Sequence, residues 1–244
     1  MKAARWMNGL GMAALASLLS ASTGWAASAT AVSTASHGGS ASATATARGN
    51  AAANAVAGAT RGGRAEANAD AIGRGRGAAL ANATAAADRG LAVSNARAYG
   101  SGRYGGVGIS RSDSLAATVG GIAISDSEAR AHGRFGGLAE SDSVSTATSL
   151  GGIAVSDSAA MSDGLFGGRA TSVSDALADT WGGLAESSVR AVSGATRYAT
   201  SRSDGVGVAV SGRYRSARAD VRAESRAHRF GNSRVNAAAV EIRD

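Results

Sequence analysis

The side chains able to do chemistry are few and scattered along this chain of 244 residues. Nucleophilic catalysis needs a base beside a serine, and the available bases are His37, His132 and His228. His132 closely follows Ser125 and Ser127, but serine neighbours almost every residue, so this spacing carries no specific signal. The chain has no cysteine, and its histidines are single and far apart, which argues against zinc. We therefore predict a non-enzymatic protein with no catalytic residue, no metal and no cofactor.

Aspartates recur within the tripeptide Ser-Asp-Ser, as at Asp126, Asp142 and Asp157. Calcium-binding β-rolls bring such carboxylates together, but their repeat also needs a third glycine followed by Asp. Here Gly105-Gly106-Val107-Gly108 is followed by Ile109, and no phosphate-binding Gly-x-x-x-x-Gly-Lys is present. These aspartates have two interpretations: they form a column of carboxylates on the surface, or they are solvated residues at turns. We favour the second interpretation.

Charge is distributed unevenly in a chain whose formal net charge is +7. Residues 101–196 hold six arginines against ten acidic residues, whereas residues 197–244 hold ten arginines against five. Tyr198, Tyr214 and Phe230 interleave with the later arginines, as in surfaces that bind nucleic acid. Outside a cell, the corresponding partner is an anionic polysaccharide or a cell-surface glycan. A solvated, solubilising face is the alternative, and we favour it.

The elements that must position these residues are marked by a diglycine that returns at a regular short interval, each time after a bulky residue. The turn glycines are Gly105, Gly106, Gly120, Gly121, Gly136, Gly137, Gly151, Gly152, Gly167, Gly168, Gly182 and Gly183. The bulky position holds Tyr104, Val119, Phe135, Leu150, Phe166, Trp181, Tyr198, Tyr214 and Phe230. Seven of the eight aromatic residues beyond residue 30 fall in this position, which predicts a repeat architecture with an aromatic ladder along one edge.

Small and large side chains alternate between the diglycines. Residues 121–133 place Gly, Ala and Ser at odd positions and larger residues at even positions. Period two puts all small side chains on one face of an extended strand, which must be the packed face. An Ala-rich helix competes locally, but the alternation continues through Gly73, Gly75 and Gly77, and each interior glycine costs a helix about 1 kcal/mol.

These patterns predict an all-β fold, a parallel β-solenoid or β-roll of 15–16-residue coils with a small-residue core of Ala, Ser and Gly. We expect Ser-Asp-Ser, midway between diglycines, to form the second turn of each coil. Twelve or so coils at about 4.8 Å would make a rod on the order of 60 Å long. An inward Ala contributes about 0.8 kcal/mol against about 1–2 kcal/mol of backbone entropy per residue, so a single repeat should be unfolded.

The chain divides into four regions. Residues 1–29 are predicted to be a secretory signal peptide, with Lys2 and Arg5 ahead of an apolar stretch that ends at Leu19. Residues 30–100 are Ala-rich irregular repeats, 101–196 are regular diglycine repeats, and 197–244 are an Arg-rich continuation and C-terminal cap. No later hydrophobic run is long enough to span a membrane, so we expect a secreted, extracellular or cell-surface protein, with a periplasmic location also compatible. Without cysteine, no disulfide staples the fold.

The pattern resembles the β-roll head repeats of trimeric autotransporter adhesins. The matching stretches are Gly121–Ser125 and Gly152–Ser156, with residues 128–133 as the second strand. The resemblance covers about 100 residues and implies a left-handed β-roll with an adhesive role. The family's heptad stalk and membrane anchor have no counterpart here. Curli-type amyloid subunits are a second comparison, but with no glutamine and scattered asparagines we expect no amide ladders of their kind.

The function expected from these features is that of a secreted structural repeat protein that self-associates into surface fibres or extracellular matrix, as in a biofilm. Open strand edges at the two ends of a solenoid would mediate this stacking, so the main partner is the protein itself. The alternative is an adhesin-like binding module that recognises a cell-surface or matrix glycan. Ice binding usually needs a regular row of threonines on one face, and only residues 44–46 and 146–148 come close to this pattern. A largely disordered chain is a further alternative, but the periodic aromatic position argues against it.

Overall fold

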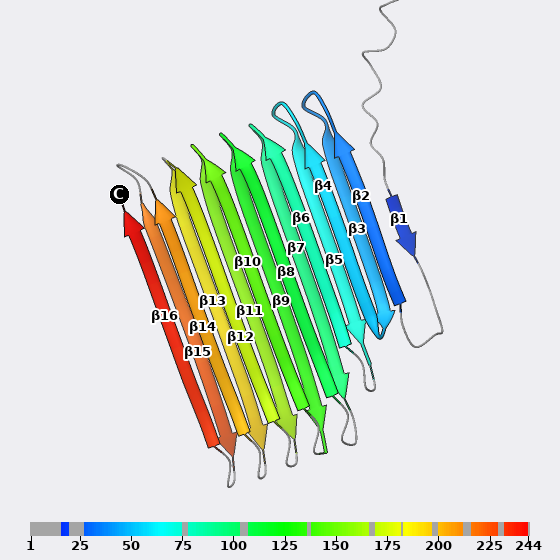
Figure 1. The fold of residues 1–244 in the computed structure, drawn as a ribbon, viewed down its shortest axis with the longest axis vertical. Helices are drawn as coiled ribbons and strands as arrows, with labels where there is room; N and C mark the ends of the chain where they lie inside the picture. Colours follow the sequence, from blue (N-terminus) through cyan, green and yellow to red (C-terminus); the bar gives the residue numbers. More distant parts are fainter. Residues whose placement is uncertain are drawn as a thin grey trace, which may run out of the picture.

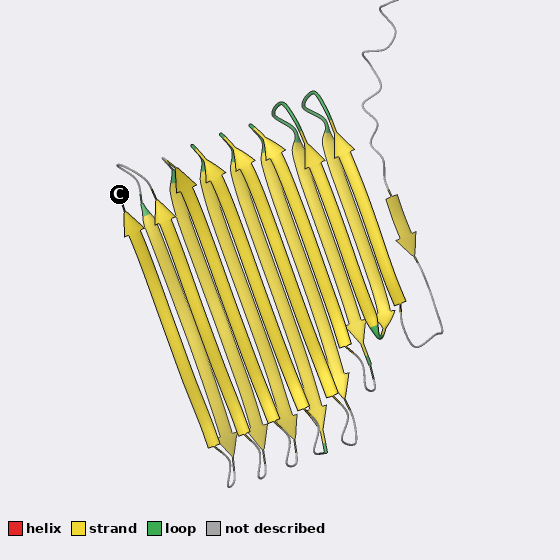
Figure 2. Ribbon diagram, in the orientation of Figure 1, coloured by secondary structure: helices red, strands yellow, loops and turns green. Residues whose placement is uncertain are grey.

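The computed structural model describes residues 16–19, 27–74, 78–102, 107–135, 138–165, 169–181, 183–196, 200–211, 216–228 and 232–243. Their regular structure is entirely β-strand (Figure 2). The strands are β1 (Ala16–Leu19), β2 (Ala27–Ala35), β3 (Ser40–Gly49), β4 (Ala51–Ala59), β5 (Arg64–Gly73), β6 (Ala78–Asp88), β7 (Leu91–Gly102), β8 (Val107–Val119), β9 (Ile122–Arg134), β10 (Leu138–Leu150), β11 (Ile153–Leu165), β12 (Arg169–Trp181), β13 (Leu184–Thr196), β14 (Thr200–Ser211), β15 (Ala217–His228) and β16 (Asn232–Arg243). No described residue belongs to a helix that could cross a membrane.

Successive strands alternate between two parallel sheets. Odd-numbered strands form the eight-stranded sheet A in sequence order, and even-numbered strands form the eight-stranded sheet B. Figure 1 shows consecutive strands running in opposite directions, so that even strands end at the upper edge and odd strands end at the lower edge. Two strands and two turns therefore make one coil, and the predicted parallel β-solenoid is confirmed.

The coil is about twice as long as predicted. Ile122 pairs with Ile153, 31 residues further on, so the interval between successive diglycines spans one strand and one turn. The expected second turn is wrong, because Ser125, Asp126 and Ser127 lie within β9. Their small-large-small order fits the alternation of a continuous strand, with both serines buried and Asp126 outward. Eight stacked strands span about 34 Å, which is shorter than the predicted rod.

The interval between diglycines alternates by one residue because the turns are unequal. Two residues, Gly120 and Gly121, connect β8 to β9, whereas three residues separate β9 from β10. The two-residue turn reverses which parity points inward, so buried positions are odd in β9 and β10 but even in β11 and β12.

The coil also lengthens along the chain. Ser40 pairs with Arg64 in an early coil, whereas Leu91 pairs with Ile122, so the paired residues lie further apart in sequence in the later coil. Strand length grows accordingly from nine residues in β2 to 13 in β8. The described residues of the Ala-rich segment, 30–74 and 78–100, thus belong to the same two sheets, in narrower coils.

The core consists of small side chains, as predicted, but its chemistry changes along the axis. Alanine fills it in the early coils, and from β8 onward serine takes many of the buried positions. The serine hydroxyls bridge the sheets: Ser125 Oγ donates to the Ser114 carbonyl at 2.8 Å, and Ser143 Oγ donates to the Ser127 carbonyl at 2.7 Å. So short a side chain reaches the opposite backbone only if the sheets lie closer than the usual spacing of about 10 Å. These bonds satisfy the hydroxyls of Ser125 and Ser143, whereas the buried hydroxyls of Ser110, Ser141, Ser162 and Ser187 have no hydrogen-bond partner.

Candidate functional site

The upper edge of the solenoid is built by the diglycine turns, and the two glycines serve different purposes. Gly120 and Gly151 have φ of 69° and 79°, a left-handed conformation that favours glycine. A Cβ on the following glycine, Gly121 or Gly152, would overlap the backbone carbonyl oxygen of the preceding upper turn, at Gly90 or Gly121 respectively. The first glycine therefore permits the turn, and the second permits adjacent coils to approach.

Hydrogen bonds between coils fix the backbone at this edge. Gly120 N donates to the Leu150 carbonyl at 2.6 Å, and Gly151 N donates to the Trp181 carbonyl at 2.8 Å. Ser149 Oγ donates to the Gly121 carbonyl at 3.1 Å, and Thr180 Oγ1 repeats this contact one coil later. The upper edge is thus a regular backbone ladder that presents side chains to solvent.

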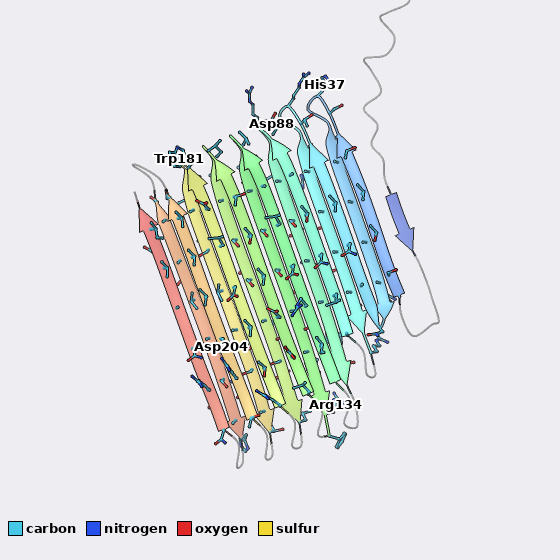
Figure 3. The ribbon with its side chains drawn as sticks, in the orientation of Figure 1. His37, Asp88, Arg134, Trp181 and Asp204 are labelled. Carbon is cyan, nitrogen blue, oxygen red and sulfur yellow. The ribbon has the colours of Figure 1, made fainter. Side chains whose placement is uncertain are left out.

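The predicted aromatic ladder along one edge is wrong. Val119, Leu150 and Trp181 do lie side by side at the upper ends of β8, β10 and β12, but Phe135 follows β9 at the lower edge. Consecutive residues of the predicted ladder are separated by one strand instead of one coil, so they lie on opposite edges of the solenoid. Figure 3 shows Trp181 on the upper edge with Asp88 and His37, and Arg134 at the lower edge. The ladder positions Tyr104, Phe166, Tyr198, Tyr214 and Phe230 and the turn glycines Gly105, Gly106, Gly136, Gly137, Gly167, Gly168 and Gly182 lie outside the described residues.

Apolar side chains also follow the diglycines of the upper edge, and sequence reasoning missed their role. Together with the residues that precede the diglycines they line the two sides of the upper edge, which we call the upper apolar ridge: Val119, Leu150 and Trp181 point outward from sheet B, and Ile122, Ile153 and Leu184 point outward from sheet A on the opposite side. All six are exposed, from 37% for Ile153 to 78% for Trp181. The recurrence of apolar residues before and after the diglycines was the feature of the sequence that could have indicated this surface.

A groove of about 810 Å³ runs beside this ridge on sheet B. Its lining includes the outward column of Thr34, Gly58, Ala86, Ala117 and Thr148, which are paired strand by strand from β2 to β10. These side chains are small, and the groove is also lined by the carboxylates of Asp88 and of Asp179, which pairs with Thr148 as the next residue of this column.

The C-terminal end of the solenoid is open. Within the described residues, no strand pairs with the outer edge of β15 or β16. Val235 continues the inward column of Ser203, which is fully buried, yet Val235 is 44% exposed. Ala237 and Ala239 are likewise inward in register and exposed. This end therefore offers both unpaired backbone groups and an uncovered core face.

The opposite end is formed by β2 in sheet B, whose inward Ala29 and Ala31 are buried. In sheet A, β1 pairs with β3 over only four residues, from Ala43 to Thr46. β1 lies within the segment predicted to be a signal peptide.

The carboxylates of the Ser-Asp-Ser tripeptides lie in mid-strand, so the prediction of solvated turn residues is wrong. Asp126 and Asp157 are neighbours on sheet A, while Asp142 lies on sheet B. Burial raises the pKa of Asp126, and the nearby charge of Asp157 raises it further. Burial and neighbouring carboxylates also raise the pKa values of Asp113 and Asp175. No group of three or more potential metal-binding side chains occurs among the described residues.

The histidine singled out from the sequence lies on the outer face. His132 Nδ1 is 3.2 Å from the Asp163 carboxylate, and its ring centroid is 5.4 Å from that of Tyr99. Ser125 and Ser127 point into the core on the opposite face of the same strand, β9. The strand itself therefore separates His132 from these serines.

Arginines on the outer faces face carboxylates on the same or neighbouring strands. Arg111 Nε is 3.3 Å from Asp142, Arg202 Nε is 2.6 Å from Asp204, and Arg130 contacts Glu128. Further pairs in the Arg-rich region are Arg218–Asp220, Arg222–Glu224 and Arg226–Glu224. These exposed pairs produce a surface of mixed charge on both sheets.

Short amide ladders are present, contrary to expectation. Asn82 Nδ2 donates to Asn54 Oδ1 at 2.9 Å on sheet B, and Asn95 Nδ2 donates to Asn68 Oδ1 at 2.8 Å on sheet A. The asparagines look scattered in the sequence because their spacing follows the coil, at 27 or 28 residues.

Two facing parallel sheets, a core of small side chains and turn ladders at the edges define a parallel β-solenoid. Comparison of the chain with protein-family models, with curated proteins and with solved structures found no match.

Proposed function

We propose that this is a secreted, non-enzymatic structural protein whose solenoids stack end to end into surface fibres or extracellular matrix, such as a biofilm matrix. The observation that carries the proposal is the open C-terminal coil, where β16 exposes its inward face and an unpaired edge. Such an edge is a template for another strand. We propose that a second copy of this chain supplies that strand, because its core has the same architecture.

The two ends have matching interiors. Ala237 and Ala239 of β16 occupy the inward columns that begin with Ala29 and Ala31 of β2. If β2 of the next copy pairs with β16 in parallel, alanine continues both of these columns, while Val235 and Glu241 of β16 continue the inward columns of Ala27 and Ser33 at the same joint. Sheet B then runs unbroken through the joint. Sheet A has room for one further strand there, in the position that β1 occupies beside β3.

Charge attraction between the ends contributes little to this joint. The outward residues of β2 are Ser28, Thr30, Val32 and Thr34, so this strand offers no carboxylate to the arginines of β15 and β16. Backbone hydrogen bonds and core burial would hold the copies together. We therefore expect stacking to depend weakly on salt.

The test uses the chain from Ala27 onward, which keeps β2 whole, and compares two lysine substitutions on β16. Ala237→Lys places a charge on the inward face of the joint, whereas Ala238→Lys places the same charge on the outer face of the same exposed strand. Negative-stain electron microscopy after concentration should show filaments for the wild type and for Ala238→Lys. Ala237→Lys should give discrete particles, because a buried lysine would have no partner.

Equal assembly of both variants would contradict stacking through β16. The alternative function is the adhesin-like module that the family resemblance implies, recognising a cell-surface or matrix glycan. Discrete particles from the wild type at all concentrations, with retention on a glycan surface, would favour that function over the structural one.

A further inference from the structure

The early turns of the upper edge hold basic residues in an unusual backbone conformation. Among the residues that the structure describes, four that are not glycine have positive φ, and three of these lie in upper turns. They are His37, Arg61 and Arg89, with φ of 57°, 57° and 53°. All three are exposed, and Figure 3 shows His37 at the upper edge. Thus each of the first three upper turns combines a left-handed residue with a basic side chain.

These turns stack directly on one another. A Cβ on Gly38 would lie 3.5 Å from the Arg61 carbonyl oxygen, and a Cβ on Gly62 would lie 3.6 Å from the Arg89 carbonyl oxygen. The turns therefore follow the spacing of the strands, about 4.8 Å per coil. Their basic side chains form a short row along the solenoid axis that we call the basic file: His37, Arg61 and Arg89.

Glycine would suit the backbone of these turns better. Arg89 N donates to the Val119 carbonyl at 2.7 Å, and in the next two turns Gly120 and Gly151 make the equivalent bond. Glycine adopts positive φ without steric cost, and asparagine or glycine is the usual choice where two successive residues do so. A basic side chain kept in three consecutive turns against this preference indicates a role outside the fold.

No carboxylate neutralises the basic file. Arginines on the outer faces pair with carboxylates, as the article's mixed-charge surface shows for both sheets, whereas no residue of the file forms an ion pair with another described residue. Asp88 precedes Arg89, but its side chain lines the groove on sheet B. Glu66, near the start of β5, is paired with Arg64 at 3.1 Å. The early upper edge therefore carries an uncompensated positive charge.

We propose that the basic file binds a linear polyuronate, an acidic polysaccharide with one carboxylate on every sugar, laid along the solenoid axis. A sugar unit is about as long as the spacing of the coils, about 4.8 Å, so successive carboxylates reach successive turns. The planar guanidinium of arginine donates two parallel hydrogen bonds to a carboxylate. This site goes beyond the stacking function and uses other residues, so either can fail without the other.

A polysaccharide fits this surface better than a nucleic acid does. Duplex DNA is held by many phosphate contacts over a broad basic surface, and single strands stack their bases on aromatic side chains. The file is one residue wide, and residues 36–39, 60–63 and 89–90 contain no phenylalanine, tyrosine or tryptophan.

The test measures binding to immobilised polygalacturonate by biolayer interferometry, with the chain from Ala27 onward in the Ala237→Lys background. The methyl ester of the same polymer is the matched ligand without charge. The parent should bind polygalacturonate at low salt, lose this binding at high salt, and ignore the ester. Arg61→Gly with Arg89→Gly should weaken binding about tenfold. The urea midpoint of this double variant should not fall, because glycine suits positive φ.

A second double variant, Arg218→Ser with Arg222→Ser, is the matched control. It lowers the net charge by the same amount in the Arg-rich region, where these arginines pair with Asp220 and Glu224. It should bind polygalacturonate like the parent. The comparison therefore separates the basic file from the region that the sequence alone associated with anionic polysaccharide.

The proposal would be overturned by a parent that binds the polymer and its methyl ester equally, or binds neither. Equal losses in the two double variants would show that net charge, and not the file, controls binding. Tighter binding of the parent to duplex DNA than to polygalacturonate, lost in Arg61→Gly with Arg89→Gly, would assign the file to nucleic acid instead.

Discussion

The second glycine of each upper turn should be far less replaceable than the first, and Gly152 is the sharpest case. A Cβ at Gly152 would overlap the Gly121 carbonyl oxygen and lie 2.5 Å from Ser149 Oγ. That same carbonyl accepts hydrogen bonds from Ile153 N at 3.0 Å and from Ser149 Oγ at 3.1 Å. Gly152→Ala must therefore push two coils apart and weaken both bonds.

The expected loss follows from these contacts. Overpacking costs about 1–3 kcal/mol, and two weakened hydrogen bonds add about 1 kcal/mol each, so Gly152→Ala should destabilise the fold by about 3–5 kcal/mol. At Gly151 a Cβ would meet nothing within 4 Å, and only the φ of 79° opposes a side chain. Gly151→Ala should cost about 1–2 kcal/mol, and Gly151→Asn should cost less because asparagine tolerates the left-handed region.

The measurement is urea unfolding followed by circular dichroism, in the Ala237→Lys background so that stacking does not contribute. The midpoint should fall in the order parent, Gly151→Asn, Gly151→Ala, Gly152→Ala, with the largest step at the last. If Gly152→Ala were as mild as Gly151→Ala, the coils would not be in the close contact that the structure describes, and the argument for the second glycine would fail.

Two further predictions concern buried or half-buried polar groups. Ser143 Oγ donates to the Ser127 carbonyl at 2.7 Å and accepts from Ser158 Oγ at 3.1 Å, so Ser143→Ala should cost about 1–2 kcal/mol. Ser141 Oγ is buried without a hydrogen-bond partner, so Ser141→Ala should be neutral or stabilising, and equal losses in urea unfolding would refute this contrast. The folded-state pKa of Asp126 is raised above its unfolded value of 3.8, so ionisation of Asp126 destabilises the fold at neutral pH, and this loss disappears as pH falls toward 4. Asp126→Asn should therefore be more stable than the parent at pH 7, with a difference that shrinks toward pH 4; a pH-independent difference in melting temperature would contradict the assignment.

The inward face could be predicted from the sequence because it depends only on period two, which is a local property of the chain. The coil length could not be predicted from local turn preference, since Ser and Asp favour turns in general. The coil length is decided by the alternation of small and large side chains, which runs through Ser125–Ser127 without a change of parity. A continuous alternation of this kind indicates one extended strand without a turn. The serines are inside because two closely spaced sheets provide acceptors for their hydroxyls, a fact that no single strand reveals.

The ridge was only half visible in the sequence for a related reason. Val119, Leu150 and Trp181 were identified as a recurring position, but Phe135 was assigned to the same edge because one repeat was taken as one coil. Ile122, Ile153 and Leu184 passed as ordinary strand residues. They join the ridge because a two-residue turn brings the end of one strand and the start of the next to the same edge.

The gradual lengthening of the coil gives the solenoid a taper, with nine residues in β2 and 12 in β16. A filament made from such units would not be uniform in outline. Each joint would set a longer strand against a shorter one and leave a ledge of about 10 Å, three residues at the rise of an extended chain. With eight strands of sheet B in each unit, the ledge would recur about every 38 Å. The fibre would thus carry a notched, directional profile, unlike an assembly of identical layers, and its two ends could be told apart by shape alone.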